Sequence, residues 1–421
     1  MSNEASMSDK ENYKGMVVVV PTRNRAQLAM NAVRSVLEQP VESVAVMISD
    51  NSTLDSERDE LAAFCRTLSD SRVRYVRPPE LLAMPAHWQW AVEQALDSYS
   101  SNHFIYLTDR MMVRNGALKE MVDLAALYPT QVISYNLDRI CDDAMPIRIE
   151  QYPATEKLVE VETLRLSRLF SQGVFHPGLP RMLNCIVPRV VFDRIRARFG
   201  NVFSSIAPDF NFCVRCLDIE DSILFFDKSP LFHYALNRSL GASASRGEMT
   251  PDNADFTANL PVDNSIRNYA TPIPSLITAV NAAFNEYLIH KQQTNSPRFF
   301  DVDLQNYLAA NALEVNEVRD SNLRAHMLGL LVQHGYQQSA PESVKSPSKL
   351  LSKLRRARKT AWLFLARRLG INPPGDLEFE FWKLSDAIDY ARNISRGNHK
   401  PWTIQVEILE GRERLRGGSR A

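Results

Sequence analysis

The chain has 421 residues, with 45% hydrophobic and 23% charged side chains, proportions that suit a folded protein and exclude general disorder. The length predicts a main domain with a second, smaller unit. The 49 basic and 49 acidic residues cancel, so the net charge indicates neither a nucleic-acid-binding protein nor a trap for acidic substrates.

The five cysteines are scattered and odd in number, which argues against a disulfide framework and favours a reducing cytoplasm. Cys213 and Cys216 form a C-x-x-C pair, but no second pair or spaced histidines complete a zinc set, so we expect structural cysteines. The polar start lacks the apolar region of a signal peptide, and no stretch reaches the ~18 apolar residues of a spanning helix. We therefore expect a protein that is neither exported nor threaded through a bilayer.

Strands and helices are expected to alternate from residue 16 onwards. The β-branched run MVVVV at 16–20 predicts a central parallel strand that is covered on both faces. Residues 25–38 carry apolar side chains near helical spacing, and VAVMI at 44–48 predicts a second buried strand. A strand, a helix and a strand in ~30 residues form a βαβ unit.

The alternation continues with a helix, a strand, a helix and a strand near 61–68, 73–76, 88–96 and 104–107. This pattern predicts an α/β fold with an open, mostly parallel, doubly wound sheet. Ligands of such sheets bind beyond the carboxyl ends of the strands, which directs attention to the loops at 21–25, 49–53 and 108–110.

The character of the sequence changes near Gly247. The segment that follows is polar and contains prolines, so it predicts a linker or surface excursion, and the remainder shows mainly helical periodicity without a fixed repeat. We therefore expect a flexible tail at 1–14, a main domain at 15–247 and a helix-rich region at 248–421.

Four segments share the order and spacing typical of one enzyme family: VVVVPTRNR, ISDNST, PAHWQWAVEQA and FIYLTDRMMVRNGALKEMV. Over roughly its first half the chain resembles family 2 glycosyltransferases, which implies a GT-A fold and a nucleotide-sugar donor. In that family the first loop and the acid after the second strand hold the nucleotide. The matching positions are Pro21, Thr22, Arg23, Asn24, Arg25 and Asp50.

The chemistry of these residue types supports the same assignment. Thr22 and Asn24 supply hydrogen bonds at a strand-to-helix turn, and the neighbouring arginines can neutralise a diphosphate or instead solvate the surface. Asp50, at the end of a strand, can accept hydrogen bonds from a base or a ribose. Its alternative role is to cap a turn with the polar residues that follow it.

The metal motif of the family, two acids separated by one residue, aligns with Thr108, Asp109 and Arg110, which is the chief departure from the family pattern. Mg²⁺ or Mn²⁺ binds oxygen ligands, so Arg110 cannot coordinate it. Either Asp109 holds the metal alone or no metal is used, in which case Arg110 can stabilise the departing diphosphate through bidentate hydrogen bonds. In the alternative, Arg110 only pairs with Asp109 and the site is degenerate.

The segment from Asn184 through FGNVFSSIAPDFNF resembles the acceptor half of the family, where an acid removes the proton of the acceptor hydroxyl. Asp209 holds that position and is the expected catalytic base of an inverting transfer. A helix N-cap is the alternative role for an aspartate next to a proline. The nearby acids in LDIED, at 217–221, look more like an exposed turn.

The stretch PLFHYALNRSLGAS is similar to the part of related enzymes that closes a loop over the diphosphate. His233, Arg238 and Ser239 are the candidates there, and we assign Arg238 to the donor. For His233 between apolar neighbours, a core position is favoured over a ligand. Trp88 and Trp90 are expected to pack in the core.

A basic segment is expected to form an amphipathic helix at 344–371, with nine Lys or Arg between Lys345 and Arg368 and no acid. Apolar residues can share one face of it, the pattern of a helix in an anionic membrane interface. A solvated helix packed on its own domain is the alternative, and nucleic-acid binding is disfavoured because no reader motif accompanies the charge.

Together these features predict an inverting glycosyltransferase that moves a sugar from a nucleotide-sugar donor to a hydroxyl of a glycan or lipid-linked acceptor in surface polysaccharide synthesis. We expect it in the cytoplasm, with a peripheral position on the inner membrane face. The non-catalytic alternative is a retired transferase that serves as a membrane-associated assembly subunit. A nucleotidyltransferase would need paired carboxylates, which the loop at 108–110 lacks.

Overall fold

The computed structural model of the chain describes residues 15–152, 154–248, 250–258, 269–337, 379–393 and 407–408. The predicted tail at 1–14 and the predicted basic helix at 344–371 lie outside the described residues. Of the helices within the described ranges, none is both long enough and apolar enough to cross a membrane.

The centre of the fold is a parallel sheet built from the strands that were expected. These strands are β1 (Met16–Thr22), β2 (Val44–Asp50), β3 (Val73–Val76) and β4 (His103–Tyr106). Parallel pairing gives the order β3-β2-β1-β4, with Val18 opposite Val46 and Val19 opposite Tyr106. Every residue of β1 and β2 is buried, which confirms the prediction of central strands covered on both faces.

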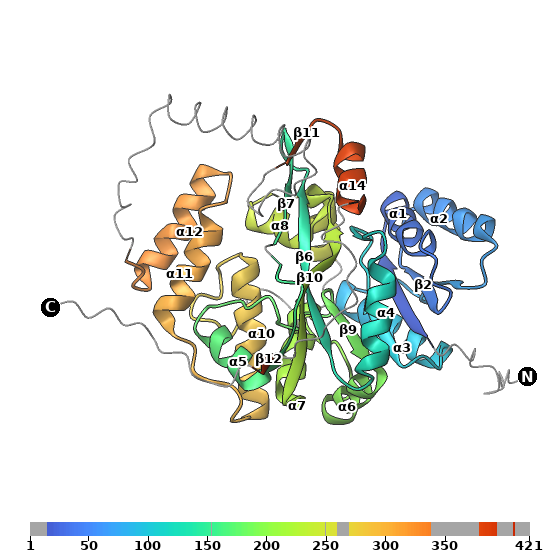
Figure 1. Cartoon of the computed structure of the whole chain (residues 1–421). Helices are drawn as coiled ribbons and strands as arrows, with labels where there is room; N and C mark the ends of the chain where they lie inside the picture. The colour runs from blue at the N-terminus through green and yellow to red at the C-terminus, as the bar shows by residue number, and fades with distance from the viewer. Residues whose placement is uncertain are drawn as a thin grey trace, which may run out of the picture.

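A mixture of antiparallel and parallel pairs extends this sheet beyond β4. The added strands are β5 (Met111–Val113), β6 (Ile133–Cys141), β7 (Ile147–Glu150), β8 (Leu158–Glu162), β9 (Cys185–Pro188), β10 (Ser222–His233), β11 (Phe379–Phe381) and β12 (Glu407–Ile408). The main path runs β12-β8-β10-β6-β9-β4-β1-β2-β3, and β9 is antiparallel to both of its neighbours (Figure 1). The predicted α/β architecture is confirmed; beyond β4 the pairs β6–β10 and β8–β12 are parallel, and the other pairs are antiparallel.

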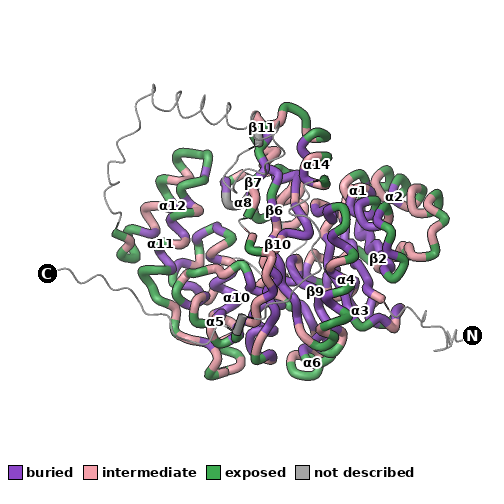
Figure 2. The backbone as a smooth tube through the Cα atoms, in the orientation of Figure 1, coloured by how far each residue is buried: buried purple, intermediate pink, exposed green. Residues whose placement is uncertain are grey.

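Helices cover both faces of the sheet. In the main domain they are α1 (Ala26–Leu37), α2 (Asp55–Leu68), α3 (Met84–Ser98), α4 (Ala117–Leu127), α5 (Thr163–Ser171), α6 (Arg189–Phe199) and α7 (Pro208–Ile219). Because side chains alternate across a strand, Val17 and Val19 enter one core with α3 and α7, whereas Val18 and Val20 enter another with α1 and α4. Figure 2 shows the strands buried and the outer sides of α2 and α6 exposed.

Further helices follow β10. They are the 3₁₀ turn η1 (Leu236–Arg238), α8 (Leu240–Ser245), α9 (Pro251–Ala258), α10 (Ala279–Thr294), α11 (Leu304–Val315), α12 (Ser321–Gln333) and α14 (Leu384–Asn393). The segment expected to be a linker after Gly247 therefore contains a helix. Side-chain caps begin three of the later helices, since Thr278, Asp303 and Asp320 each accept a hydrogen bond from an amide of the first turn.

The helices α10 to α12 complete one core of the sheet domain. The ring of Phe170 in α5 lies 5.7 Å from that of Phe284 and 4.9 Å from that of Tyr287, both in α10. These rings belong to the same buried cluster as Val17 and Val19 of β1. The division of the chain at residue 247 stays a prediction, but the residues after it supply apolar surface that the sheet domain buries.

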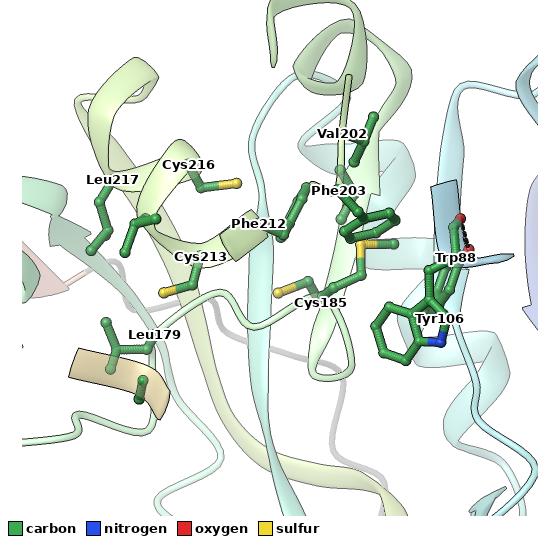
Figure 3. Close-up of a cluster of buried hydrophobic side chains, with 14 of the residues drawn as sticks. Trp88, Tyr106, Leu179, Cys185, Val202, Phe203, Phe212, Cys213, Cys216 and Leu217 are labelled. Carbon is green, nitrogen blue, oxygen red and sulfur yellow. Dashed lines mark hydrogen bonds between the residues drawn. The ribbon is translucent and has the colours of Figure 1, made fainter. Parts of the chain in front are cut away.

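Cys213 and Cys216 lie inside this core. Both thiols are free and buried, and burial raises their pKa well above the usual value. Figure 3 shows them among Leu179, Phe212 and Leu217, with apolar side chains around the sulfur atoms. The C-x-x-C pair thus fills space in the core, as expected for structural cysteines.

The packing predicts that Phe170→Ala destabilises the whole described fold. Phe170 is completely buried, so its removal should lower the free energy of unfolding by about 3–5 kcal/mol. Leu164→Ala, on the same helix but 40% exposed, is the matched control and should change it by less than about 0.5 kcal/mol. Denaturant unfolding followed by circular dichroism measures both, and equal effects of the two changes would contradict the shared core.

Candidate functional site

A cavity of about 1740 Å³ opens beyond the carboxyl ends of β1, β2 and β4. Its walls come from the loops at 21–25, 51–54 and 108–110, together with the start of α7 and the segment from η1 to α9. Ligand pockets for one small molecule commonly measure about 300–1,000 Å³, so this cavity has room for two substrates. The loops that were predicted to meet at the edge of the sheet do line one cavity.

Asp109 joins two of these loops. Its side chain is almost completely buried, with 3% exposure, and accepts a hydrogen bond from Thr22 Oγ1 at 3.0 Å. The other carboxylate oxygen accepts from Arg25 Nη1 at 3.3 Å. Burying a carboxylate is costly unless a cation and hydrogen-bond donors contact it, and the loop after β1 supplies both.

Arg110 lies in the cavity wall beside this pair. Its guanidinium donates to the carbonyl oxygen of Tyr234 at 3.5 Å and has no carboxylate within 4 Å among the described residues. Burial lowers the pKa of Arg110 to about 10, an effect that the nearby charge of Asp109 opposes. Arg110 therefore remains a cation at neutral pH, and Arg25 rather than Arg110 is the ion-pair partner of Asp109.

Asp109 has no unpartnered carboxylate oxygen to offer a divalent metal in this structure. Both oxygens of Asp109 are engaged by Thr22 and Arg25, so a metal ion would have to displace the guanidinium of Arg25. Within the described ranges, no group of three or more His, Cys, Asp or Glu side chains is arranged to hold a metal. Mg²⁺ and Mn²⁺ favour sites with carboxylate oxygens, whereas Asp109 is surrounded by arginines.

Asp50 is fully buried and is not among the residues that line the cavity. One of its oxygens accepts from the amide of Ser52 at 2.8 Å. The other accepts from Tyr75 Oη at 2.7 Å and from Arg77 Nη1 at 2.8 Å. Asp50 thus orders the loop after β2, in the turn-capping role weighed as its alternative, and Asn51 and Thr53 of that loop reach the cavity instead.

Asn24 fastens the loop after β1 to the loop after β2. Its backbone is in the left-handed region, with φ of 54°, a conformation that asparagine tolerates better than most residues. Its side-chain oxygen accepts from the amides of Thr53 and Leu54 at 2.9 and 3.0 Å. The Asn24 side chain is therefore used to shape the crevice, and Pro21 beside it lines the cavity.

Of the four arginines predicted to face a diphosphate, three come together and have an acidic partner from α9; Arg110 is the exception. Asp252 lies 3.2 Å from Arg25 and 2.6 Å from Arg238, and Asp255 accepts from Arg23 at 2.8 Å. Sequence reasoning missed both acids, because the segment was interpreted as a linker. The signal was the i, i+3 spacing of the two aspartates after a proline, which presents both on one helix face.

Asp209 lies in the first turn of α7 and lines the cavity. The N-cap of α7 is Ala207, so Asp209 does not have the capping role considered as its alternative. Burial raises the pKa of Asp209, an effect that the charge of Arg181 opposes. Such a carboxylate is a stronger proton acceptor than a solvated one, and it faces the same cavity as the donor loops.

The acids of LDIED do not line the cavity. Asp218 is buried and pairs with Arg198 at 2.8 Å, and it also accepts from Ser296 Oγ at 2.7 Å. Glu220 is buried as well and lies 2.9 Å from Arg194. The expected exposed turn is thus largely buried, and these carboxylates tie the far end of α7 to neighbouring segments.

Sequence reasoning also missed Glu286, on α10. It is 1% exposed, and its carboxylate accepts from Asn211 Nδ2 at 3.2 Å. Burial raises the pKa of Glu286 to about 7, and Asp209 is among the charges that act on it. The available sequence signal is a glutamate on the apolar side of a predicted helix. This signal does not indicate which part of the protein the helix packs against.

His233 and Trp88 both line the cavity; Trp88 also packs in the core, whereas His233, for which a core position was favoured, is only partly buried. Burial and the charge of Arg110 lower the pKa of His233 to about 3, so its imidazole is neutral at physiological pH. Trp88 is 8% exposed, and its ring lies 5.1 Å from that of Tyr106 and 5.6 Å from that of Phe203. Figure 3 shows this aromatic group, with a dashed hydrogen bond between Tyr106 and Trp88.

Among solved structures, the chain is similar to crystal structures of S. aureus TarS. The structure of TarS 1–349 and its complex with UDP-GlcNAc are each 12% identical to this chain, with a TM-score of 0.41. Both matches cover 76% of this chain. They cover 88% of the TarS chain in the first structure and 89% in the complex. A longer TarS structure is 13% identical, with a TM-score of 0.38, and the match covers 76% of this chain and 54% of the TarS chain. No curated protein matches the chain significantly.

Comparison with protein families gives a match over the part of the chain that holds the donor loops. Residues 17–179 fit the model described as glycosyl transferase family 2. This segment begins with β1, contains Asp109 and Arg110, and ends on the wall of the cavity at Leu179. The match identifies residues 17–179 as a glycosyl transferase family 2 domain, and the chain is therefore a glycosyltransferase.

Proposed function

We propose that the chain is an inverting transferase, which moves a sugar from a nucleotide-sugar donor to a hydroxyl of a glycan or lipid-linked acceptor. The observation that carries this proposal is the position of Asp209, a carboxylate with a raised pKa in the same cavity as the arginine-rich donor loops. A single base opposite a leaving group is the minimum that a one-step displacement needs.

Asp209 removes the proton of the acceptor hydroxyl as the oxygen attacks the anomeric carbon. The new bond forms on one face of the sugar while the bond to the nucleoside diphosphate breaks on the other, so the anomeric configuration inverts. The diphosphate carries away the electron pair, and the proton stays on Asp209 until solvent takes it. The transition state has oxocarbenium character, so orientation and fixed charges matter more than a covalent nucleophile.

Arg110 stabilises the departing diphosphate in place of a metal ion. It is a cavity-lining cation with no carboxylate within 4 Å among the described residues, so its donors can turn to an anionic leaving group. Guanidinium groups bind phosphate oxygens in a bidentate manner, and donors already placed where negative charge develops lower the barrier. Asp109 fixes Arg25 beside it rather than binding Mg²⁺ or Mn²⁺.

The acceptor half of the cavity begins at α7 and is bordered by Phe175, Phe210 and Ile277. We assign the acceptor to surface polysaccharide synthesis and place the enzyme in the cytoplasm, peripheral on the inner membrane face. The basic segment at 344–371 would supply attraction to anionic lipids, which is worth about 1 kcal/mol for each basic residue near the surface. A nucleic-acid partner is not part of this proposal.

One observation favours the alternative of a retired transferase that works as a membrane-associated assembly subunit. Arg23, Arg25 and Arg238, three of the four arginines assigned to the donor, are paired with carboxylates of the chain itself, as an unused anion site would be. A subunit of this kind would bind its partners without turning over any nucleotide sugar. The two functions therefore differ in whether nucleoside diphosphate is released.

The proposed function predicts that Asp209→Asn abolishes turnover. The amide keeps the shape of the side chain but cannot accept a proton, so release of nucleoside diphosphate should fall by at least about 100-fold. A panel of UDP-, GDP- and dTDP-sugars with a cell-envelope glycan extract as acceptor measures the release. Asp193→Asn, an exposed aspartate on α6, is the matched control and should keep full activity. Donor binding without release in the unmodified protein would establish the retired subunit instead.

The raised pKa of Asp209 predicts where activity is lost in acid. Asp209 accepts a proton only when ionised, so kcat/KM should fall as the pH drops through its pKa, at a pH above the usual range of aspartate near 3.9. Arg181→Met removes a charge that lowers this pKa and should move the acidic limb to higher pH. Arg196→Met, at a half-buried arginine of α6 that pairs with Asp193, should leave the limb in place. An unchanged limb in Arg181→Met would exclude Asp209 as the titrating base.

A further inference from the structure

The arginines that face the donor part of the cavity are held by one short helix. Arg238 donates to both oxygens of Asp252, from Nε at 2.6 Å and from Nη2 at 3.2 Å. Arg25 lies 3.2 Å from the same carboxylate, and Arg23 donates to Asp255 at 2.8 Å. Two loops that are far apart in sequence are therefore bridged by the carboxylates of α9.

Asp252 is ionised in its place on α9. Burial opposes ionisation of Asp252, but the hydrogen bond from Arg238 and the charge of Arg25 outweigh it and hold the pKa of Asp252 below its usual value. The same contact raises the pKa of Arg238, where the hydrogen bond to Asp252 is the largest effect. The contact between Arg238 and Asp252 thus persists at neutral pH as a charge-assisted hydrogen bond.

The α9 helix is itself part of the cavity wall. Asp252, Asp255 and Phe256 all line it, together with the arginines that the two acids contact. The Nε atom of Arg25 is buried and donates no hydrogen bond within the described part of the chain, so the carboxylates do not satisfy this arginine completely. An anion with more acceptor oxygens than a carboxylate would satisfy it better.

We propose that Asp252 and Asp255 occupy the positions of the donor's diphosphate, and that a diphosphate must displace α9 from Arg23, Arg25 and Arg238 to bind. Carboxylate and phosphate groups compete for the same guanidinium geometry. The two aspartates therefore set the affinity for the donor by holding its site in the free enzyme. This inference rests on the proposed function, because it takes the ligand of the three arginines to be a diphosphate.

Binding of inorganic pyrophosphate, measured by isothermal titration calorimetry, tests the inference. Asp252→Asn/Asp255→Asn keeps the size of both side chains and removes their charge, so the dissociation constant should fall by at least about tenfold. Each single variant should give part of this gain. Hydrogen exchange of the α9 amides gives a second readout, and exchange should rise when pyrophosphate binds to the unmodified protein.

Glu57→Gln is the matched control for the loss of negative charge. Glu57 lines the same cavity, but it accepts from the amide of Ala26 at 2.7 Å and contacts none of the three arginines within ion-pair distance. Its change should alter the dissociation constant by less than about twofold, because it frees no guanidinium. An equal gain in Glu57→Gln would attribute the effect to overall charge and overturn the displacement.

Equal pyrophosphate affinity in the unmodified protein and the aspartate variants would also overturn the inference. It would leave the proposed function standing if nucleoside diphosphate is still released from a sugar donor. Absence of pyrophosphate binding in all variants would overturn it as well, and release of nucleoside diphosphate would again decide the function separately. If the double variant fails to fold, the single variants and the exchange of α9 in the unmodified protein still decide the outcome.

Discussion

The crevice depends on one buried carboxylate. Asp109 is 3% exposed and follows β4, so the chain has to supply it with a cation and donors within the protein. Thr22 and Arg25, from the loop after β1, meet this need at 3.0 and 3.3 Å. The contact draws two strand ends together and aims Arg25 at the cavity. It also engages both oxygens of the carboxylate in the loop at 108–110.

The need for oppositely charged partners also applies to the arginines between Asp109 and α9. Arginines that crowd one edge of a sheet repel each other unless anions lie between them, and in this structure those anions are Asp252 and Asp255. The segment after β10 therefore returns to the donor loops instead of leaving the domain. Farther along, α10 brings Glu286 against the start of α7, near Asp209. Both parts of the cavity thus depend on residues beyond 247.

Sequence patterns predicted the parts of the fold that local chemistry determines. The β-branched runs at 16–20 and 44–48 are central strands because few other positions bury both faces. The loops that meet at the cavity followed from strand direction alone. The pairing of charges could not be predicted in this way. Arg77 pairs with Asp50, and Arg25 pairs with Asp252, through tertiary contacts that have no recognisable spacing in the sequence. For this reason Asp50 was expected to contact the nucleotide, whereas in the structure it is buried beneath the loop that follows β2.

The most direct test of this account is release of nucleoside diphosphate in the presence of EDTA, compared between the unmodified protein and Arg110→Met. The account predicts that EDTA leaves turnover unchanged, because arginines rather than a metal ion stabilise the diphosphate. It also predicts that Arg110→Met lowers kcat by about 100-fold or more with little change in donor affinity. Turnover that EDTA abolishes and Mn²⁺ restores, with Arg110→Met as active as the unmodified protein, would contradict it.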